Sequence, residues 1–279
     1  MHYQSDIIPK GFSLSREEAA RCTLLIHFGL KDTSFCVLDD QSQVKMIGEV
    51  SMRVQDEEEL EKLITDFDIL SFQFQEVKVS LDTFKFTFIP LIHYNSAFLD
   101  EYGRFVNPDE GESISLNRIP TAAVANVFAI NTRFQQAILK RFQHPKIFTQ
   151  VSPFLNGARR ISQANAAFNV FVNVKSTAFE IGVIREEGLQ FYNIFPLTSP
   201  EEFNYFLLLV LQQFQLTAEN SILTISGRIS EDDMLFLVLK KYFVRIVSAP
   251  TEVVFNLAPG LRALQSPVHY SLLSLQLCD

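Results

Sequence analysis

Six short apolar runs, three early in the chain and three past its middle, alternate with tight polar links. Runs of this length, rich in β-branched and aromatic residues, predict buried strands, and links this short favour antiparallel hairpins. The predicted strands cover residues 24–29, 33–38, 44–50, 168–173, 177–184 and 188–195. Each of two parts of the chain therefore contains a triplet of neighbouring strands.

An internal repeat connects the two triplets. Identical residues recur at an offset of 144 positions: Thr33 with Thr177, Phe35 with Phe179, and the glutamates at 57–58 with those at 201–202. Each triplet leads into a helix and then a strand, at 56–67 and 76–80 and again at 199–214 and 222–226. A further helix and strand follow in each part, so the pattern predicts a βββαβαβ unit present twice.

The helix predicted in the second unit has a well-marked start. Ser199 is a candidate N-cap, Pro200 takes the first helical position, and Glu202 completes a capping box. Residues 203–214 are apolar nearly all round, which predicts a helix buried on every side.

The first unit carries extra material. A hairpin is predicted through 84–89, a helix near 95–102 and a strand around 122–130, with an exposed polar loop at 107–113. We predict two domains, a first half with insertions over residues 1–160 and a second half over residues 161–279. No Gly/Ser-rich linker lies near the boundary, so the halves are expected to share an interface.

The composition excludes several classes of protein. The formal net charge of −8 argues against a general nucleic-acid binder, which needs a basic face. The longest apolar stretch, 206–211, is far shorter than the roughly 20 residues that span a bilayer. No secretion signal is visible, and three widely spaced cysteines form no disulfide framework. We expect a cytoplasmic protein without membrane insertion.

The aromatic residues are unusual, with 27 Phe, seven Tyr and no Trp. Phenylalanines that fill the core would explain the count. An exposed aromatic patch that binds a protein partner is the alternative. The sequence alone does not separate these two interpretations.

Common catalytic motifs are missing from the sequence. No two glycines lie closer than Gly182 and Gly188, which excludes the glycine-rich loops GxGxxG and GxxxxGK. The five histidines are scattered, so we predict no metal site and no catalytic residue. Cys22 and Cys36 lie beside or within apolar strands, where an inert buried thiol is expected.

Three short segments connect the repeat with a known superfamily. They are HFGLKDT at 27–33, NVKST at 173–177 and SG at 226–227, each at a strand end or turn. With the duplicated βββαβαβ order, they resemble the nucleotide motifs of the actin-like, ribonuclease H-like ATPase fold. Actin, the heat-shock 70 chaperones and sugar kinases share that fold, and the chain is most similar to an uncharacterised bacterial family within it. The resemblance implies an α/β fold with mixed sheets flanked by helices.

The resemblance also implies a nucleotide cleft between the halves, of which this sequence keeps a remnant. Its residues are His27, Gly29, Thr33, Asn173, Thr177 and Gly227. In the superfamily an Asp stands at the positions of His27 and Asn173, where it helps to organise magnesium, and a Gly stands where this chain has Lys175. The motifs are therefore degenerate. A purely structural explanation stays open, in which Gly29 and Gly227 serve only tight turns.

Two functions follow from the resemblance. The first is a non-catalytic binding or scaffold module with a degenerate cleft, a pseudo-ATPase that needs no cofactor and acts through an unidentified protein partner. The alternative is an ATP-dependent kinase or ATPase with substituted metal ligands, whose cofactors would be ATP and magnesium. The missing carboxylates at positions 27 and 173 favour the first, because phosphoryl transfer depends on electrostatic positioning.

Overall fold

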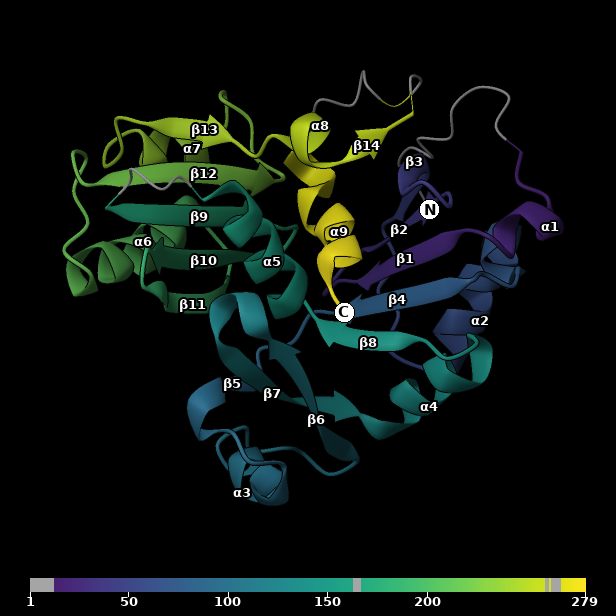
Figure 1. Ribbon diagram of the computed structural model, residues 1–279. Helices are drawn as coiled ribbons and strands as arrows, with labels where there is room; N and C mark the ends of the chain where they lie inside the picture. The colour runs from purple at the N-terminus through teal and green to yellow at the C-terminus, as the bar shows by residue number, and fades with distance from the viewer. Residues whose placement is uncertain (1–12, 163–166, 259–260, 262–266) are drawn as a thin grey trace.

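Two large sheets lie side by side, with a small third sheet beside them (Figure 1). The computed structural model describes residues 13–162, 167–258, 261 and 267–279. In spatial order the six-stranded sheet contains β14 (Asn256–Leu257), β3 (Gln43–Val50), β2 (Thr33–Leu38), β1 (Thr23–Phe28), β4 (Glu76–Leu81) and β8 (Lys146–Thr149). The five-stranded sheet contains β11 (Gly188–Pro196), β10 (Ala178–Arg185), β9 (Phe168–Val174), β12 (Ser221–Gly227) and β13 (Ile246–Ser248).

The two large sheets have the same topology. In each, the first strand pairs antiparallel with the second and the second with the third, as in β1–β2–β3 and β9–β10–β11. In each, the first strand also pairs in parallel with the strand after the helix, as in β1–β4 and β9–β12. A further parallel strand closes each series, β8 in one sheet and β13 in the other. The predicted duplication and α/β fold class are confirmed.

The strand register corrects the offset of the repeat. His27 lies opposite Ser34 on the second strand, and Asn173 lies opposite Glu180 in the same way. The equivalent positions are therefore 146 residues apart, like His27 and Asn173, and not 144. The prediction was wrong by two positions because a shift of two leaves every side chain on the same face of its strand.

The third sheet consists of β5 (Phe86–Pro90), β7 (Val124–Asn131) and β6 (Glu112–Ile119), with α3 (Leu99–Gly103) beside it. The hairpin predicted at 84–89 was wrong, because β5 pairs with the distant strand β7. Strand β6 was not predicted at all. Most of its side chains are only half-buried, and Ile114 and Leu116 alternate with polar residues, so the segment lacks the continuous apolar run of the other strands.

Helices cover the sheets on both sides. In the first half, α1 (Arg16–Ala19) precedes β1, and α2 (Glu57–Asp66) and α4 (Thr132–Arg141) pack on one face of the six-stranded sheet. In the second half, α6 (Pro200–Gln213) and α7 (Met234–Leu239) pack on the five-stranded sheet. This arrangement leaves the facing sides of the two large sheets to be filled by other elements.

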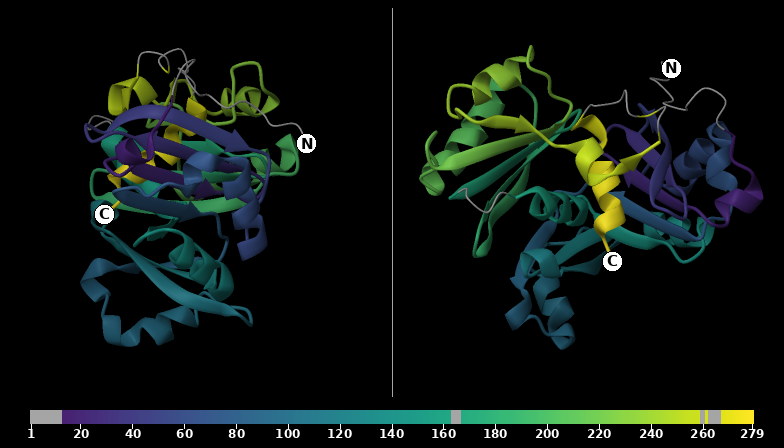
Figure 2. Two further views of the ribbon diagram at one scale, coloured as in Figure 1. Left: turned by 90° about the vertical axis from the view of Figure 1, so that its right-hand side faces the viewer. Right: turned by 45° about the horizontal axis from the view of Figure 1, so that its top comes forward.

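Those facing sides are filled by α5 (Val151–Ile161) and the end of the chain. After α8 (Thr251–Val254), the C-terminal segment, residues 267–279, forms α9 (Tyr270–Ser274), which lies between the two large sheets in both Figure 1 and Figure 2. Its Leu272 and Leu273 pack against Leu25 and Cys36 of the first sheet. The division of the chain at residues 160 and 161 stays a prediction, and strand β14 joins the first sheet from beyond it.

Helix α6 is buried on one face only, so the prediction of a helix buried on every side was wrong. Phe203, Leu207, Val210 and Leu211 are buried, but Tyr205 and Leu209 are exposed. The reason is that α6 covers the sheet from outside, with α7 packed beside it, and leaves its far side to solvent.

The difference in burial between Leu207 and Leu209 gives a matched pair of variants. Leu207→Asp should abolish folding, because it places an unpaired charge at a fully buried position of the core. Leu209→Asp should change the free energy of unfolding by less than about 1 kcal/mol, because Leu209 is 45% exposed. Soluble yield and chemical denaturation measure both. Equal behaviour of the two variants would contradict this account of the helix.

Candidate functional site

The candidate site lies where strands of the two halves end opposite each other. The carboxyl ends of the parallel strands β1 and β4 face those of β9 and β12 across the junction between the large sheets. The carboxyl ends of parallel strands are where α/β proteins commonly bind ligands. Two hairpin turns, one after β1 and one after β9, complete the junction.

The duplication is visible in a hydrogen bond that occurs once in each half. His27 on β1 lies opposite Ser80 on β4, with 2.8 Å between Nδ1 and Oγ. Asn173 on β9 lies opposite Ser226 on β12, and the serine hydroxyl donates to Asn173 Oδ1 at 2.9 Å. Equivalent polar residues are therefore held rigidly at the ends of both first strands.

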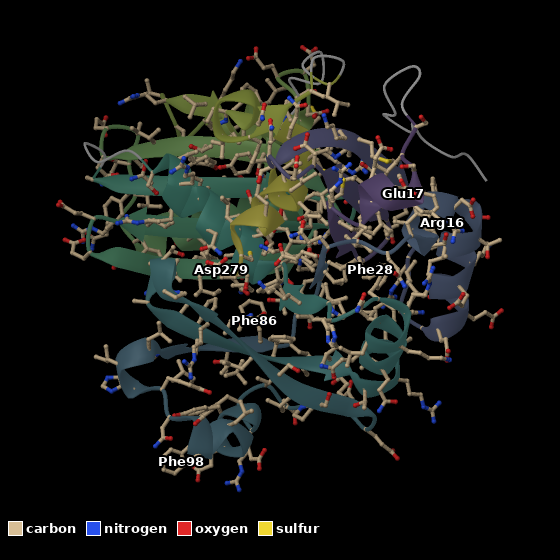
Figure 3. The ribbon with its side chains drawn as sticks, turned by 45° about the vertical axis from the view of Figure 1, so that its right-hand side comes forward. Arg16, Glu17, Phe28, Phe86, Phe98 and Asp279 are labelled. Atoms are coloured by element: carbon tan, nitrogen blue, oxygen red, sulfur yellow. The ribbon has the colours of Figure 1, made fainter. Side chains whose placement is uncertain are left out.

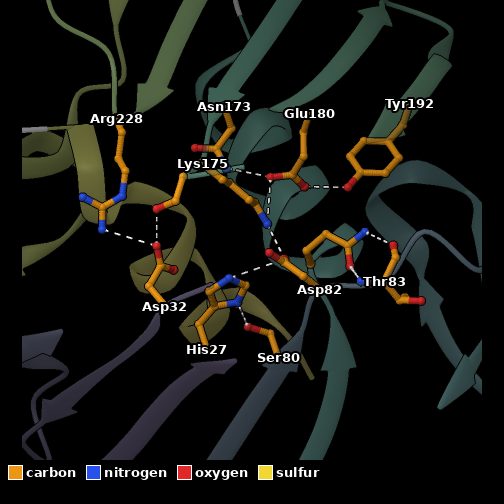
Figure 4. Close-up of polar contacts among 12 residues, drawn as sticks. His27, Asp32, Ser80, Asp82, Thr83, Asn173, Lys175, Glu180, Tyr192 and Arg228 are labelled. Carbon is orange, nitrogen blue, oxygen red and sulfur yellow. Dashed lines mark hydrogen bonds and ion pairs between the residues drawn. The ribbon is translucent and has the colours of Figure 1, made fainter. Parts of the chain in front are cut away.

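The centre of the junction is the side chain of Lys175, directly after β9. Its ammonium contacts Asp82, which follows β4 of the other half, and lies 3.3 Å from Glu180 Oε2 on β10 (Figure 4). Asp82 and Glu180 are 2% and 0% exposed, and Lys175 is 13% exposed. A buried cation thus bridges two buried carboxylates and joins the two halves.

The remaining bonds of the carboxylates are also satisfied. Glu180 accepts a hydrogen bond from Asn173 Nδ2 at 2.6 Å and another from the Tyr192 hydroxyl at 2.5 Å. Asp82 lies 3.4 Å from Nε2 of His27. We call His27, Asp82, Asn173, Lys175, Glu180 and Tyr192 the junction network.

The pKa directions agree with these contacts. Burial alone would raise the pKa of Asp82, but the neighbouring Lys175 and His27 outweigh it and hold this pKa well below its usual range. Burial would likewise lower the pKa of Lys175, but Asp82 and Glu180 raise it instead. Burial, followed by the charge of Glu180, raises the pKa of Tyr192. Lys175 is therefore charged and the tyrosine neutral at physiological pH.

A second set of ion pairs joins the halves with the charges reversed. Arg228 follows Ser226 by two positions, as Asp82 follows Ser80. The guanidinium of Arg228 contacts Glu49 and lies 3.5 Å from Asp32 of the first half, and Asp32 also accepts a hydrogen bond from Ser176. The first half thus presents Asp82 to Lys175, and the second half presents Arg228 to Asp32.

Little space is left at the junction. A cavity of about 50 Å³ lies there, lined among others by His27, Asn173 and Gly227 and by His269 and Leu272 of the C-terminal segment. Burial lowers the pKa of His269 to about 4, so this imidazole is neutral. Pockets that bind small molecules usually have a volume of about 300–1,000 Å³.

The structure brings together only part of the predicted remnant. His27, Asn173 and Gly227 line the small cavity, whereas Gly29 lines a larger one beside it. The Thr33 hydroxyl is buried and donates to the carbonyl of Met52 at 2.8 Å. Thr177 is exposed in its turn.

The two glycines have structural roles. A Cβ at Gly227, where φ is +82°, would lie 2.0 Å from the carbonyl oxygen of Val174. A Cβ at Gly29 would lie 2.9 Å from the carbonyl oxygen of Asp32, which accepts the Gly29 N–H. Both positions need glycine for close backbone approach, whatever else the junction does.

Sequence reasoning missed Asp82, Glu180, Tyr192 and Arg228. Glu180 had a usable signal, since it is the single charged residue inside the apolar run 178–184. Asp82 also had one, since it stands just after a buried parallel strand. The partner of Asp82 could not be read from the sequence, because Lys175 is far from Asp82 along the chain.

The fold and the junction between two equivalent halves define the class of protein, an actin-like ATPase fold. A crystal structure of a Bacteroides thetaiotaomicron protein with this fold and unknown function is similar, with a TM-score of 0.75 and 19% identity over 91% of this chain and 99% of that one. The PilM–PilN type IV pilus biogenesis complex matches with a TM-score of 0.62 and 10% identity over 91% and 97%.

Residues 12–246 match the family described as "Protein of unknown function (DUF3822)", and the chain belongs to that family. No curated protein matches the sequence significantly. Within the described residues, no helix is long and apolar enough to cross a membrane. The same part of the chain holds no group of three or more His, Cys, Asp or Glu side chains suited to a metal ion.

Proposed function

We propose that this protein is a non-catalytic cytoplasmic binding module that uses the actin-like fold without a nucleotide. The observation that carries the proposal is the position of Lys175. Its ammonium bridges Asp82 and Glu180 at the turn that would hold phosphates in an actin-like ATPase. A cation supplied by the chain itself therefore stands where the fold would otherwise place a magnesium nucleotide.

The residues at the junction do not fit such a ligand. A nucleotide needs backbone N–H groups close to its phosphates and a hydrated magnesium ion held by carboxylates. Here the two central carboxylates already bind Lys175, and the cavity of about 50 Å³ is far too small for a triphosphate. Opening it would break the contacts of Asp82 and Arg228 across the junction.

In place of nucleotide chemistry, we propose that the fold serves to bind another protein. The PilM–PilN structure is a complex, so a protein of this fold works with a partner there. The two halves of the present chain are joined by the pair of Lys175 with Asp82 and by the pairs of Arg228 with Glu49 and Asp32, which hold them together to present one binding surface.

The proposal predicts that ATP with magnesium leaves the melting temperature unchanged and is not hydrolysed. If the protein bound ATP with micromolar affinity, millimolar ATP would stabilise it by about 4 kcal/mol, an easily measured shift. Thermal unfolding should be recorded with ATP and magnesium, with ATP alone, and with sodium sulfate as the control for general anion effects.

A stabilisation that requires magnesium and disappears in Asp82→Asn would contradict the proposal. It would favour the ATP-dependent kinase or ATPase, in which Asp82 would leave Lys175 and serve the metal. Stabilisation by sulfate and ATP alike, without magnesium, would show only a general anion effect and would leave the non-catalytic proposal standing.

A further inference from the structure

A groove of about 570 Å³ lies between the first large sheet and the small sheet, and it shares only Asp82 with the junction network. It is bounded by the ends of β1 and β4, by the connection from β3 to α2 and by the passage from β7 into α4. This volume lies within the range of about 300–1,000 Å³ that is usual for ligand pockets.

The floor of the groove is apolar and well packed. It contains Phe28, Leu81, Phe128, Ile130 and Phe134, all buried in the core. Figure 3 shows Phe28 between the first large sheet and the small sheet. The aromatic ring of Phe84 lies at the rim and is 49% exposed. An apolar side chain that entered the groove would find contacts on its floor and at its mouth.

The charges that line the groove are satisfied internally, with one exception. Lys85 pairs with Glu112 at 2.7 Å, and Asp82 pairs with Lys175. Asp56 caps its own helix by accepting the Glu59 N–H at 2.8 Å. The exposed guanidinium of Arg53 has no hydrogen bond or ion pair with any residue that the structure describes. Among the charged side chains of the groove that the structure describes, Arg53 is therefore the one without a bonded partner.

The backbone beside Arg53 is also open. Residues 52–55 run from the end of β3 to α2 without regular secondary structure. Within the described part of the chain, no hydrogen bond reaches the backbone N–H or C=O group of the exposed Arg53, whereas Val54 is buried and Gln55 N–H donates to Glu59. Unpaired backbone groups along a groove are suited to an extended peptide, which supplies its own N–H and C=O groups in return.

We infer that this groove binds an extended segment of a partner protein that carries a carboxylate for Arg53 and a large apolar side chain for the floor. The inference rests on the proposed binding function and gives the chemistry of its partner. Charge complementarity selects the carboxylate, since Arg53 is the cation left without a partner among the described groove residues. The unpaired backbone selects a peptide over a free carboxylic acid, which offers no matching N–H groups.

Selection of short random peptides displayed on phage against the full chain tests the inference. Enriched peptides should combine Asp, Glu or a free C-terminus with a nearby large apolar residue. A synthetic peptide of the enriched sequence should lose at least about tenfold in affinity for Arg53→Glu, a change of about 1.4 kcal/mol. Phe84→Ala should weaken it about fivefold.

Two variants control for charge and for exposed apolar area away from the groove. Arg245→Glu makes the same charge change on the second half of the chain. Ile92→Ala removes an exposed apolar side chain that follows strand β5 of the small sheet. Both should leave the peptide affinity unchanged. Octanoate, a free amphipathic carboxylic acid, should not compete with the peptide at concentrations near the peptide's Kd.

Three results would overturn the inference. They are enrichment of peptides without acidic groups, equal loss in Arg53→Glu and Arg245→Glu, and binding of octanoate as tightly as of the peptide. Peptides without acidic groups would exclude the carboxylate. Equal loss in the two arginine variants would exclude the groove as the binding site. Tight binding of octanoate would indicate a site for small molecules. None of these three results depends on nucleotide. Failure of the peptide inference is therefore distinct from a magnesium-dependent increase in melting temperature with ATP, which would overturn the proposed function.

Discussion

Replacing Lys175 by methionine should lower the free energy of unfolding by about 3–5 kcal/mol, because it leaves two buried carboxylates without their cation. Asp82 and Glu180 are both almost completely shielded from water, so solvent cannot take the place of the ammonium. Methionine keeps the length and most of the volume of the lysine stem, which limits the packing change. Chemical denaturation of the full chain measures the loss.

Two further variants separate this charge effect from a general sensitivity of the protein. Adding Asp82→Asn and Glu180→Gln to Lys175→Met should recover most of the stability, since the network then holds no unpaired charge. Lys140→Met removes an exposed pair with Glu57, which water and salt screen, so it should change the free energy of unfolding little. If Lys175→Met and Lys140→Met melted alike, the bridge would contribute nothing.

The same network predicts a dependence on pH. The pKa of Asp82 is lower in the folded state than in the unfolded state. Its contribution to the free energy of unfolding is therefore fully present above the unfolded pKa of about 4, and it is lost as the pH falls from there through the folded pKa. The pKa of Lys175 is raised, so its contribution is lost only at strongly alkaline pH. In Lys175→Met the carboxylates lack a cation and protonate more easily. The stability gap between parent and variant should therefore shrink as the pH is lowered.

Removing the C-terminal segment, residues 267–279, should leave no folded protein. Lys78 lies in the middle of the first sheet, and its buried ammonium donates to the carbonyls of Cys278 and Gln276 at 2.5 and 3.2 Å. Deletion would take away these acceptors and expose the apolar face that contains Leu25 and Cys36. Both effects are among the large destabilising changes known for proteins.

A graded series checks this expectation in chains that still fold. Leu273→Ala should cost about 2–5 kcal/mol, because Leu273 is fully buried between the two large sheets. Deletion of the exposed Asp279 alone should cost little. Thermal unfolding of the deletion of 267–279, of Leu273→Ala and of the deletion of Asp279 gives the order of their stabilities. A chain without residues 267–279 that melted like the parent would show that the segment only covers the sheet.

Most of the fold could be predicted from the sequence because the two large sheets are built from local patterns. The strands of both triplets are short apolar runs with tight links, and their order follows from the repeat. The small sheet could not be predicted fully, since β5 pairs with β7 across more than thirty residues and β6 has no continuous apolar run. The place of α9 depends on packing against the first half, which no local pattern records.

The candidate site was predictable only at the positions that the duplication marks. His27 and Asn173 stand at equivalent strand ends, and the structure brings both to the junction. The charges that matter there were not found, because ion pairs such as Asp82 with Lys175 join segments that follow no common sequence pattern. Thr33 was expected in the cleft because it fits the first phosphate motif of the superfamily, but its buried hydroxyl donates to the carbonyl of Met52 instead.

The reversed charges at the junction make the two halves complementary to each other and not to themselves. Two identical copies of the first half would bring Asp82 against the turn that carries Asp32, and two copies of the second half would bring Arg228 toward Lys175. Like charges at such positions repel, so the ion pairs at the junction favour the pairing of two different halves over the pairing of two copies of one half. Neither half can therefore be exchanged for a copy of the other without losing these ion pairs.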